Sequence, residues 1–90
     1  RDTCFDTAQR LLKSYLLQER WDAAIKVSHD VLALDATFEF AYQVLMQCHA
    51  ARGNRATVNA VYQRCVAALH DELDVAPSVE TTRLWQQLTK

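Results

Sequence analysis

The sequence predicts an all-α fold in which two helical hairpins stack side by side and a further helix closes the end. Its 90 residues include one Gly and one Pro, so the chain has few of the residues that make tight turns between β-strands. Apolar residues recur every three or four positions, as on one face of a helix, and do not alternate with polar ones as in a half-buried strand. The two predicted hairpins also repeat each other at a spacing of 34 residues. These observations favour a single, all-helical domain over residues 1–90.

The first hairpin is predicted at about 4–34, with a first helix at about 4–18. The inner face of this helix is predicted to carry Phe5, Ala8, Leu11, Leu12, Tyr15 and Leu16. The chain then turns without a Gly, so Glu19 is expected in the left-handed backbone conformation at a cost of about 1 kcal/mol. The second helix, at about 21–34, has apolar residues on two faces, which is typical of a helix packed between two neighbours.

The second hairpin is predicted at about 37–73, and its first helix is expected to begin near Thr37. Gly53 ends this helix, because Gly adopts the left-handed conformation of a helix C-terminus without strain. Asn54 is the expected N-cap of the next helix, since its side-chain oxygen can accept a hydrogen bond from a free backbone N–H. This turn is the best-defined joint in the sequence.

A closing helix is predicted at about 78–89. Pro77 breaks the preceding helix, and Ser78 can act as the N-cap of the last one. Glu80 then lies in the first turn, where the helix dipole favours negative charge. The packing face of this helix is predicted to carry Leu84, Trp85 and Leu88.

The 34-residue spacing extends to individual positions. When the first hairpin is aligned with the second by a shift of 34 residues, Leu11 aligns with Leu45, Tyr15 with His49, Ala24 with Val58, Val31 with Cys65, and the turn at Glu19 with Gly53. Two helical hairpins of equal length at this period are typical of a tetratricopeptide solenoid. The predicted architecture is therefore a tetratricopeptide-like, right-handed stack of two hairpins plus the closing helix.

Charge and composition exclude several classes of function. The chain has 10 Lys and Arg against 11 Asp and Glu, so it lacks the basic stripe of a nucleic-acid-binding segment. No run approaches the roughly 20 apolar residues of a membrane span. The three Cys residues form no Cys-x-x-Cys pair, which favours reduced thiols and a cytoplasmic location. Arg20, Arg52 and Arg55 gather at the two equivalent turns, where they form either a solvated edge or a contact for an acidic partner.

No catalytic, metal or cofactor site is predicted. Cys48 and His49 are neighbours on a helix and point about 100° apart, so they cannot act on each other as nucleophile and base. The positions of Cys65, His70 and the other ligand-type residues match no metal-binding spacing. A thiol enzyme stays as an alternative, and it requires a cysteine with a lowered pKa.

The candidate binding surface is the concave groove, which the first helix of each hairpin is expected to line. The groove positions are Asp6, Gln9, Arg10, Lys13 and Leu17 in the first hairpin, and Phe40, Gln43, Val44 and Gln47 in the second. Phe38 and Phe40 are not expected to face the same core, so Phe40 is either a candidate exposed aromatic or packed against the next helix. The predicted protein-binding residues are Gln9, Arg10, Lys13, Phe40, Gln43, Gln47, Arg83 and Gln87. Plain solvated surface is the alternative.

The second hairpin and the closing helix also carry a family signature. Its residues are Gly53, Tyr62, Leu69, Glu72, Leu73, Pro77, Ser78, Glu80 and Thr81, preceded by Leu32, Leu34, Asp35, Glu39, Leu45 and Met46. In these residues the chain resembles the bacterial transcriptional activator domain, the tetratricopeptide-like module of SARP/OmpR-type bacterial regulators. The chain departs from that pattern at Val58, where a small residue is usual, at Asp74, where Gly is favoured, and at Ala36, where Pro is favoured.

The resemblance implies a non-enzymatic regulatory module. Such modules usually follow a winged-helix or OmpR-like DNA-binding domain, so DNA contact belongs to a domain outside this segment. The expected partner is the regulator's own DNA-binding domain, a second copy or a signalling partner. The family module is longer, so these residues are expected to be its C-terminal part, cut from a longer protein, and the exposed first hairpin is expected to favour a homodimer. The alternative function is a tetratricopeptide adaptor that binds an extended peptide.

Overall fold

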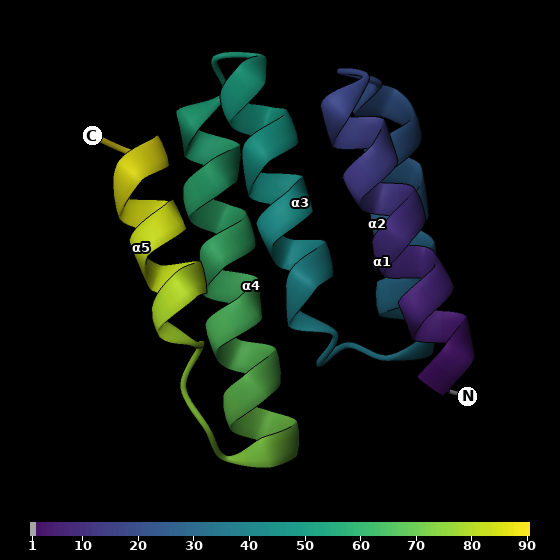
Figure 1. The fold of residues 1–90 in the computed structure, drawn as a ribbon. Coiled ribbons are helices and arrows are strands. Elements are labelled where there is room, and N and C mark those ends of the chain that lie inside the picture. The colour runs from purple at the N-terminus through teal and green to yellow at the C-terminus, as the bar shows by residue number, and fades with distance from the viewer. Residues whose placement is uncertain (1) are drawn as a thin grey trace.

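The computed structural model describes residues 2–90, with side chains described from residue 5 onward. The described residues form five α-helices and no strand. The helices are α1 (Asp2–Leu17), α2 (Trp21–Leu34), α3 (Glu39–Ala51), α4 (Arg55–Leu73) and α5 (Val79–Leu88) (Figure 1). The predicted all-α fold is confirmed.

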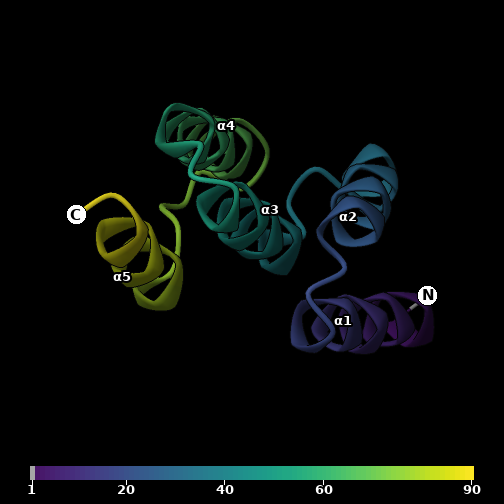
Figure 2. The ribbon, with the colours of Figure 1, turned by 90° about the horizontal axis from the view of Figure 1, so that it is seen from above.

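The helices form two rows. Seen from above, α1, α3 and α5 lie on one side of the molecule and α2 and α4 on the other (Figure 2). The central helix is α3, which contacts each of the other four. The first helix of each hairpin and the closing helix therefore share one side, as expected for a stack of helical hairpins.

Three residues with positive φ turn the chain between helices. Glu19 has φ 56° between α1 and α2, and Gly53 has φ 73° between α3 and α4. Both were predicted, because each position needs a left-handed residue at a helix end. Asp74 also adopts this conformation, with φ 54°, at the end of α4. A side chain at positive φ costs about 1–2 kcal/mol, so Glu19 and Asp74 are held there by the surrounding structure.

Both predicted N-caps are present. The Asn54 side-chain oxygen accepts a hydrogen bond from the Thr57 N–H at 3.2 Å, which closes the first turn of α4. The Ser78 hydroxyl oxygen accepts one from the Thr81 N–H at 3.3 Å at the start of α5. Each bond satisfies a backbone donor that the helix itself leaves free.

The third helix begins at Glu39, two residues after the predicted start near Thr37. The Asp35 carboxylate accepts hydrogen bonds from the Thr37 N–H at 2.9 Å and from its hydroxyl at 2.6 Å. These bonds hold Thr37 in a turn, as Asp side chains often do when they compete with a helix. Phe38 is the N-cap residue and has a non-helical backbone, with ψ 89°.

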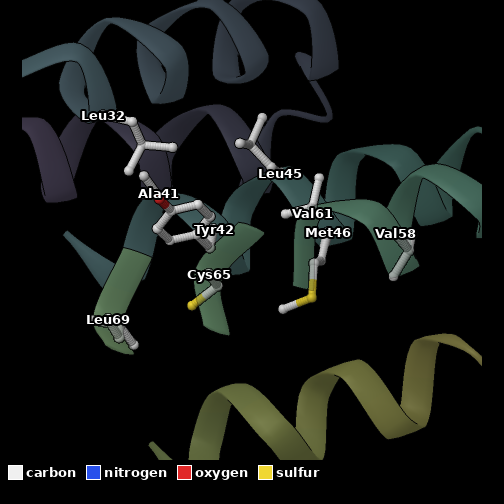
Figure 3. Close-up of a cluster of buried hydrophobic side chains, with 9 residues drawn as sticks. All are labelled: Leu32, Ala41, Tyr42, Leu45, Met46, Val58, Val61, Cys65 and Leu69. Carbon is white, nitrogen blue, oxygen red and sulfur yellow. The ribbon is translucent and has the colours of Figure 1, made fainter. Parts of the chain in front are cut away.

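The core consists of two clusters. The first joins α2, α3 and α4, and its buried residues are Leu32, Ala41, Tyr42, Leu45, Met46, Val58, Val61, Cys65 and Leu69 (Figure 3). The second joins α1, α2 and α3, and its buried residues are Leu12, Ala24, Val44 and Cys48. The closing helix covers the first cluster with Leu84, Trp85 and Leu88, which confirms its predicted packing face.

Leu11 was predicted on the inner face of the first helix, and this prediction is wrong. Its side chain is 39% exposed, whereas Leu45, 34 residues later, is 0% exposed. The two positions differ in their neighbours, since Leu45 lies in the first cluster together with Leu32 of α2. No helix of the described chain covers the matching side of α1, so the repeat in the sequence does not produce equal burial.

Ser28 is the one described residue whose buried side-chain oxygen has no hydrogen-bond partner. Because an unsatisfied buried hydroxyl costs free energy, we expect Ser28→Ala to leave the stability unchanged or raise it by up to about 1 kcal/mol. Urea denaturation followed by circular dichroism measures this change. A loss of more than about 1 kcal/mol would show that the hydroxyl has a partner in solution.

Candidate functional site

A pocket opens between α1 and α3. Its volume is about 430 Å³, and its lining residues are Lys13, Leu16, Leu17, Phe40 and Gln47. Three of these, Lys13, Phe40 and Gln47, are predicted protein-binding residues, and the structure brings them together. We call this pocket the groove.

The surface of the groove is largely apolar. Leu17 is 87% exposed, and Leu16 and Phe40 are half-buried. The Lys13 ammonium nitrogen lies 6.0 Å from the centroid of the Phe40 ring, at the outer limit of a cation–π contact, so it reaches across from α1 to α3. An apolar surface beside a cation can bind a protein segment that offers an apolar side chain and a carboxylate.

A second hollow, of about 290 Å³, adjoins the groove along α1. Its lining residues are Asp6, Gln9, Arg10 and Lys13, so Lys13 borders both hollows. Neither Arg10 nor Lys13 has a salt-bridge partner within the described part of the chain. Both cations are therefore available to an acidic group from outside.

Two predictions about the groove are wrong. Val44 is fully buried in the second cluster and lines no part of the surface. Phe38 and Phe40 both pack against that same cluster, although they were not expected to share a core, and Phe40 is half-buried. Helical spacing does not apply to this pair, because Phe38 precedes the first helical residue of α3. Its ring instead lies against Phe5 of α1, with centroids 5.2 Å apart.

The remaining predicted contact residues lie away from the groove. The Gln43 side-chain amide donates a hydrogen bond to the Thr81 hydroxyl oxygen at 2.8 Å, so it joins α3 to α5. Arg83 and Gln87 are exposed on α5 and border neither hollow. The structure thus groups five of the eight predicted residues, namely Gln9, Arg10, Lys13, Phe40 and Gln47.

A polar joint between α3 and α5 was not predicted. The Glu39 carboxylate accepts hydrogen bonds from the Ser78 N–H at 2.8 Å, from the Ser78 hydroxyl at 2.7 Å and from the Thr81 hydroxyl. Burial raises the pKa of the Glu39 carboxyl, but the hydrogen bonds from Thr81 and Ser78 oppose it and hold the pKa below its ordinary value of 4.5. All three residues belong to the family signature in the sequence, which is the signal that could have located this joint.

The described thiols are not activated. Burial raises the pKa of Cys48 to about 11. Burial, with a smaller effect from the charge of Glu39, raises the pKa of Cys65 to about 12. Since the thiolate is the nucleophile, neither residue is suited to a thiol enzyme at neutral pH. The side chain of Cys4 lies outside the described residues.

Over residues 5–90, whose side chains the structure describes, no three His, Cys, Asp or Glu side chains are grouped so that they could hold a metal ion. In the same region no helix has the length and apolar character needed to cross a membrane.

The family model described as "Bacterial transcriptional activator domain" matches residues 1–89. No curated protein and no solved structure matches the chain. The match extends over all five helices, including the groove and the joint between α3 and α5.

Proposed function

Because the chain belongs to the bacterial transcriptional activator domain family, we propose that it is a protein-interaction module of a bacterial transcriptional regulator. It binds through the groove between α1 and α3, and it couples the regulator to a second copy, to the DNA-binding domain or to a signalling partner. The observation that carries this proposal is the exposed apolar groove beside two cations, Arg10 and Lys13, which form no salt bridge with another described side chain. DNA contact belongs to another domain of the regulator, and the module acts in the cytoplasm, where transcription takes place.

The chemistry of the groove indicates the kind of segment that it accepts. Leu17 and Phe40 offer apolar contact area, and Arg10 and Lys13 offer positive charge along one side. The matching segment therefore carries an apolar side chain next to Asp or Glu. Solvated surface explains the charges, whereas the grouping of Leu16, Leu17 and Phe40 in one largely apolar pocket favours a contact site.

The alternative is an adaptor that clamps the C-terminal carboxylate of an extended peptide. Such a clamp needs several convergent donors, usually Asn and Lys, because a carboxylate is bound by charge-assisted hydrogen bonds. The groove offers Lys13 and Gln47 and no Asn. We therefore favour binding of an internal acidic segment over binding of a C-terminal carboxylate. Amidating the C-terminus of a test peptide separates the two functions, since only the clamp loses affinity.

We expect Lys13→Glu to weaken binding of a short helical peptide of Leu and Glu at least tenfold, which corresponds to about 1.4 kcal/mol. The melting temperature should stay the same, because the Lys13 side chain is exposed and a surface substitution changes stability by less than about 0.5 kcal/mol. A titration of labelled protein followed by NMR measures both the affinity and the affected residues, which should lie on α1 and α3.

Arg64→Glu is the matched control, since it makes the same change of charge at an exposed position on α4, outside the groove. It should leave the affinity within about twofold of the unmodified protein. Equal losses in the two variants would indicate a general effect of net charge. Full binding by Lys13→Glu would remove the groove from the proposal.

A further inference from the structure

A second surface lies at the turn between α4 and α5, at the opposite end of the stack from the turns at Glu19 and Gly53 (Figure 1). Three apolar side chains, Leu73, Val75 and Val79, are between 49% and 62% exposed there. We call this surface, residues 71–80, the corner. Exposed apolar side chains that lie together and are rimmed by polar residues mark protein contact sites.

The charge of the corner is entirely acidic. Asp71, Glu72, Asp74 and Glu80 are all exposed, and no Lys or Arg occurs between residues 65 and 82. Among the side chains that the structure describes, their one basic salt-bridge partner is His70, whose ring nitrogens lie 3.4 Å from the Asp71 carboxylate and 3.9 Å from that of Asp74. These carboxylates are therefore available to a basic group from outside.

The three arginines at the other end, Arg20, Arg52 and Arg55, have contacts within the fold. Arg52 forms a salt bridge with Asp22, and Arg55 donates a hydrogen bond to the backbone carbonyl of Lys90 at 3.0 Å. The Arg20 guanidinium lies 5.0 Å from the centroid of the Tyr15 ring. The two ends of the stack thus differ, since the carboxylates of the corner form no salt bridge with a Lys or Arg whose side chain the structure describes.

The acidic residues of the corner do not stabilise α4. Asp71 and Glu72 lie in its last turn, where the helix dipole disfavours a negative charge. Asp74 adds a carboxylate at positive φ, where Gly would fit without strain. The turn itself is held by other contacts, including the Asp74 N–H, which donates to the His70 carbonyl at 3.0 Å. Folding accounts for Glu80, which lies in the first turn of α5, but it does not account for the charges of Asp71 and Glu72.

We propose that the corner of one copy of this chain binds in the groove of a second copy. The groove calls for an apolar side chain next to a carboxylate, and the corner presents Leu73 and Val75 beside Glu72 and Asp74. Two corners would repel each other, as would the cationic sides of two grooves, so the contact pairs unlike surfaces. This inference rests on the groove being a binding surface, as proposed above, and it names the partner.

A contact between unlike surfaces has a consequence for assembly. Each copy that uses its groove still has a free corner, and each copy that uses its corner still has a free groove, so association continues head to tail unless the rotation closes a ring. The mean mass of the protein should therefore rise steadily with concentration. A contact made by one turn in one pocket of about 430 Å³ is expected to be weak, which suits a regulated interaction.

The test is a charge exchange in the intact chain, measured by sedimentation velocity over a range of concentrations. The groove variant carries Arg10→Glu and Lys13→Glu, and the corner variant carries Asp71→Lys and Glu72→Lys. Each variant alone should associate at least tenfold more weakly than the unmodified protein. The chain with all four substitutions should recover association to within about threefold, because the opposite charges meet again with their signs exchanged.

Arg64→Glu with Asp30→Lys is the matched control, because both positions are exposed and lie outside the groove and the corner. It should associate like the unmodified protein. Failure of the fourfold variant to recover, or a monomer at every concentration, overturns the inference. If the peptide of Leu and Glu still binds the groove while the chain stays monomeric, the groove keeps its proposed function and the second copy is the wrong partner. If neither the peptide nor a second copy binds, both proposals fail.

Discussion

Leu45→Ala is expected to destabilise the domain by about 3 kcal/mol, because it leaves a cavity in the centre of the larger core cluster. Leu45 is 0% exposed and packs in the cluster that joins α2, α3 and α4. For a domain of this size, such a loss lowers the melting temperature by about 15 °C. Urea denaturation at low protein concentration, followed by circular dichroism, measures the free energy of unfolding.

Leu11→Ala provides the sharpest comparison, since Leu11 is the equivalent position in the first hairpin. Its side chain is partly exposed, so the same substitution should cost only about 1 kcal/mol. Leu17→Ala, at a position that is almost fully exposed, should change the stability by less than about 0.5 kcal/mol. Equal losses at Leu11 and Leu45 would mean that something covers the outer side of α1 in solution.

The joints of this fold could be predicted from the sequence because their causes are local. A left-handed residue was needed at Glu19 and Gly53, and both adopt positive φ. Asn54 and Ser78 cap their helices through side chains three residues from the donor. The exception, the late start of α3, is also local, since the Asp35 carboxylate competes with the helix for Thr37.

The environment of individual side chains was less predictable, because it depends on which neighbouring helix covers each face. The 34-residue repeat predicts the same burial for Leu11 and Leu45, but only Leu45 packs against a helix of the preceding hairpin. Val44 was assigned to the groove from its place on α3, although α1 covers it. The polar joint connects Glu39 to Ser78 and Thr81, which are 39 and 42 positions away in the sequence. Contacts at this separation cannot be predicted from a local sequence pattern.

The candidate site could be predicted in outline from the role of the first helix in each hairpin. That rule places Lys13 on α1 and Phe40 and Gln47 on α3, and the structure brings all three to one pocket. It does not identify Gln43 as part of the α3–α5 joint, because the partner of Gln43 is on the closing helix. The corner was missed, since its exposed apolar residues fit an ordinary helix end in the sequence.

Glu39→Gln is expected to destabilise the domain by about 1–2 kcal/mol at pH 7, because it removes the charge that strengthens three hydrogen bonds. The effect should be largest at α5, which these bonds tie to α3. Trp85 reports on this helix, since its ring stacks on Tyr62 of α4 with centroids 4.2 Å apart. Hydrogen exchange of the α5 backbone and Trp fluorescence measure the loosening of the helix, and urea denaturation measures the total loss.

The effect of Glu39→Gln should also depend on pH. The pKa of Glu39 is lower in the folded than in the unfolded chain, so its ionised carboxylate stabilises the fold above the ordinary value of 4.5. This stabilisation is lost as the pH falls through the folded pKa, and the two proteins should then approach equal stability. Glu72→Gln, which changes an exposed carboxylate on α4, should cause no loss at pH 7. A constant difference between the original protein and Glu39→Gln from pH 7 to pH 3 would show that the loss does not come from the charge of Glu39. The joint would then depend on the shape of the side chain alone.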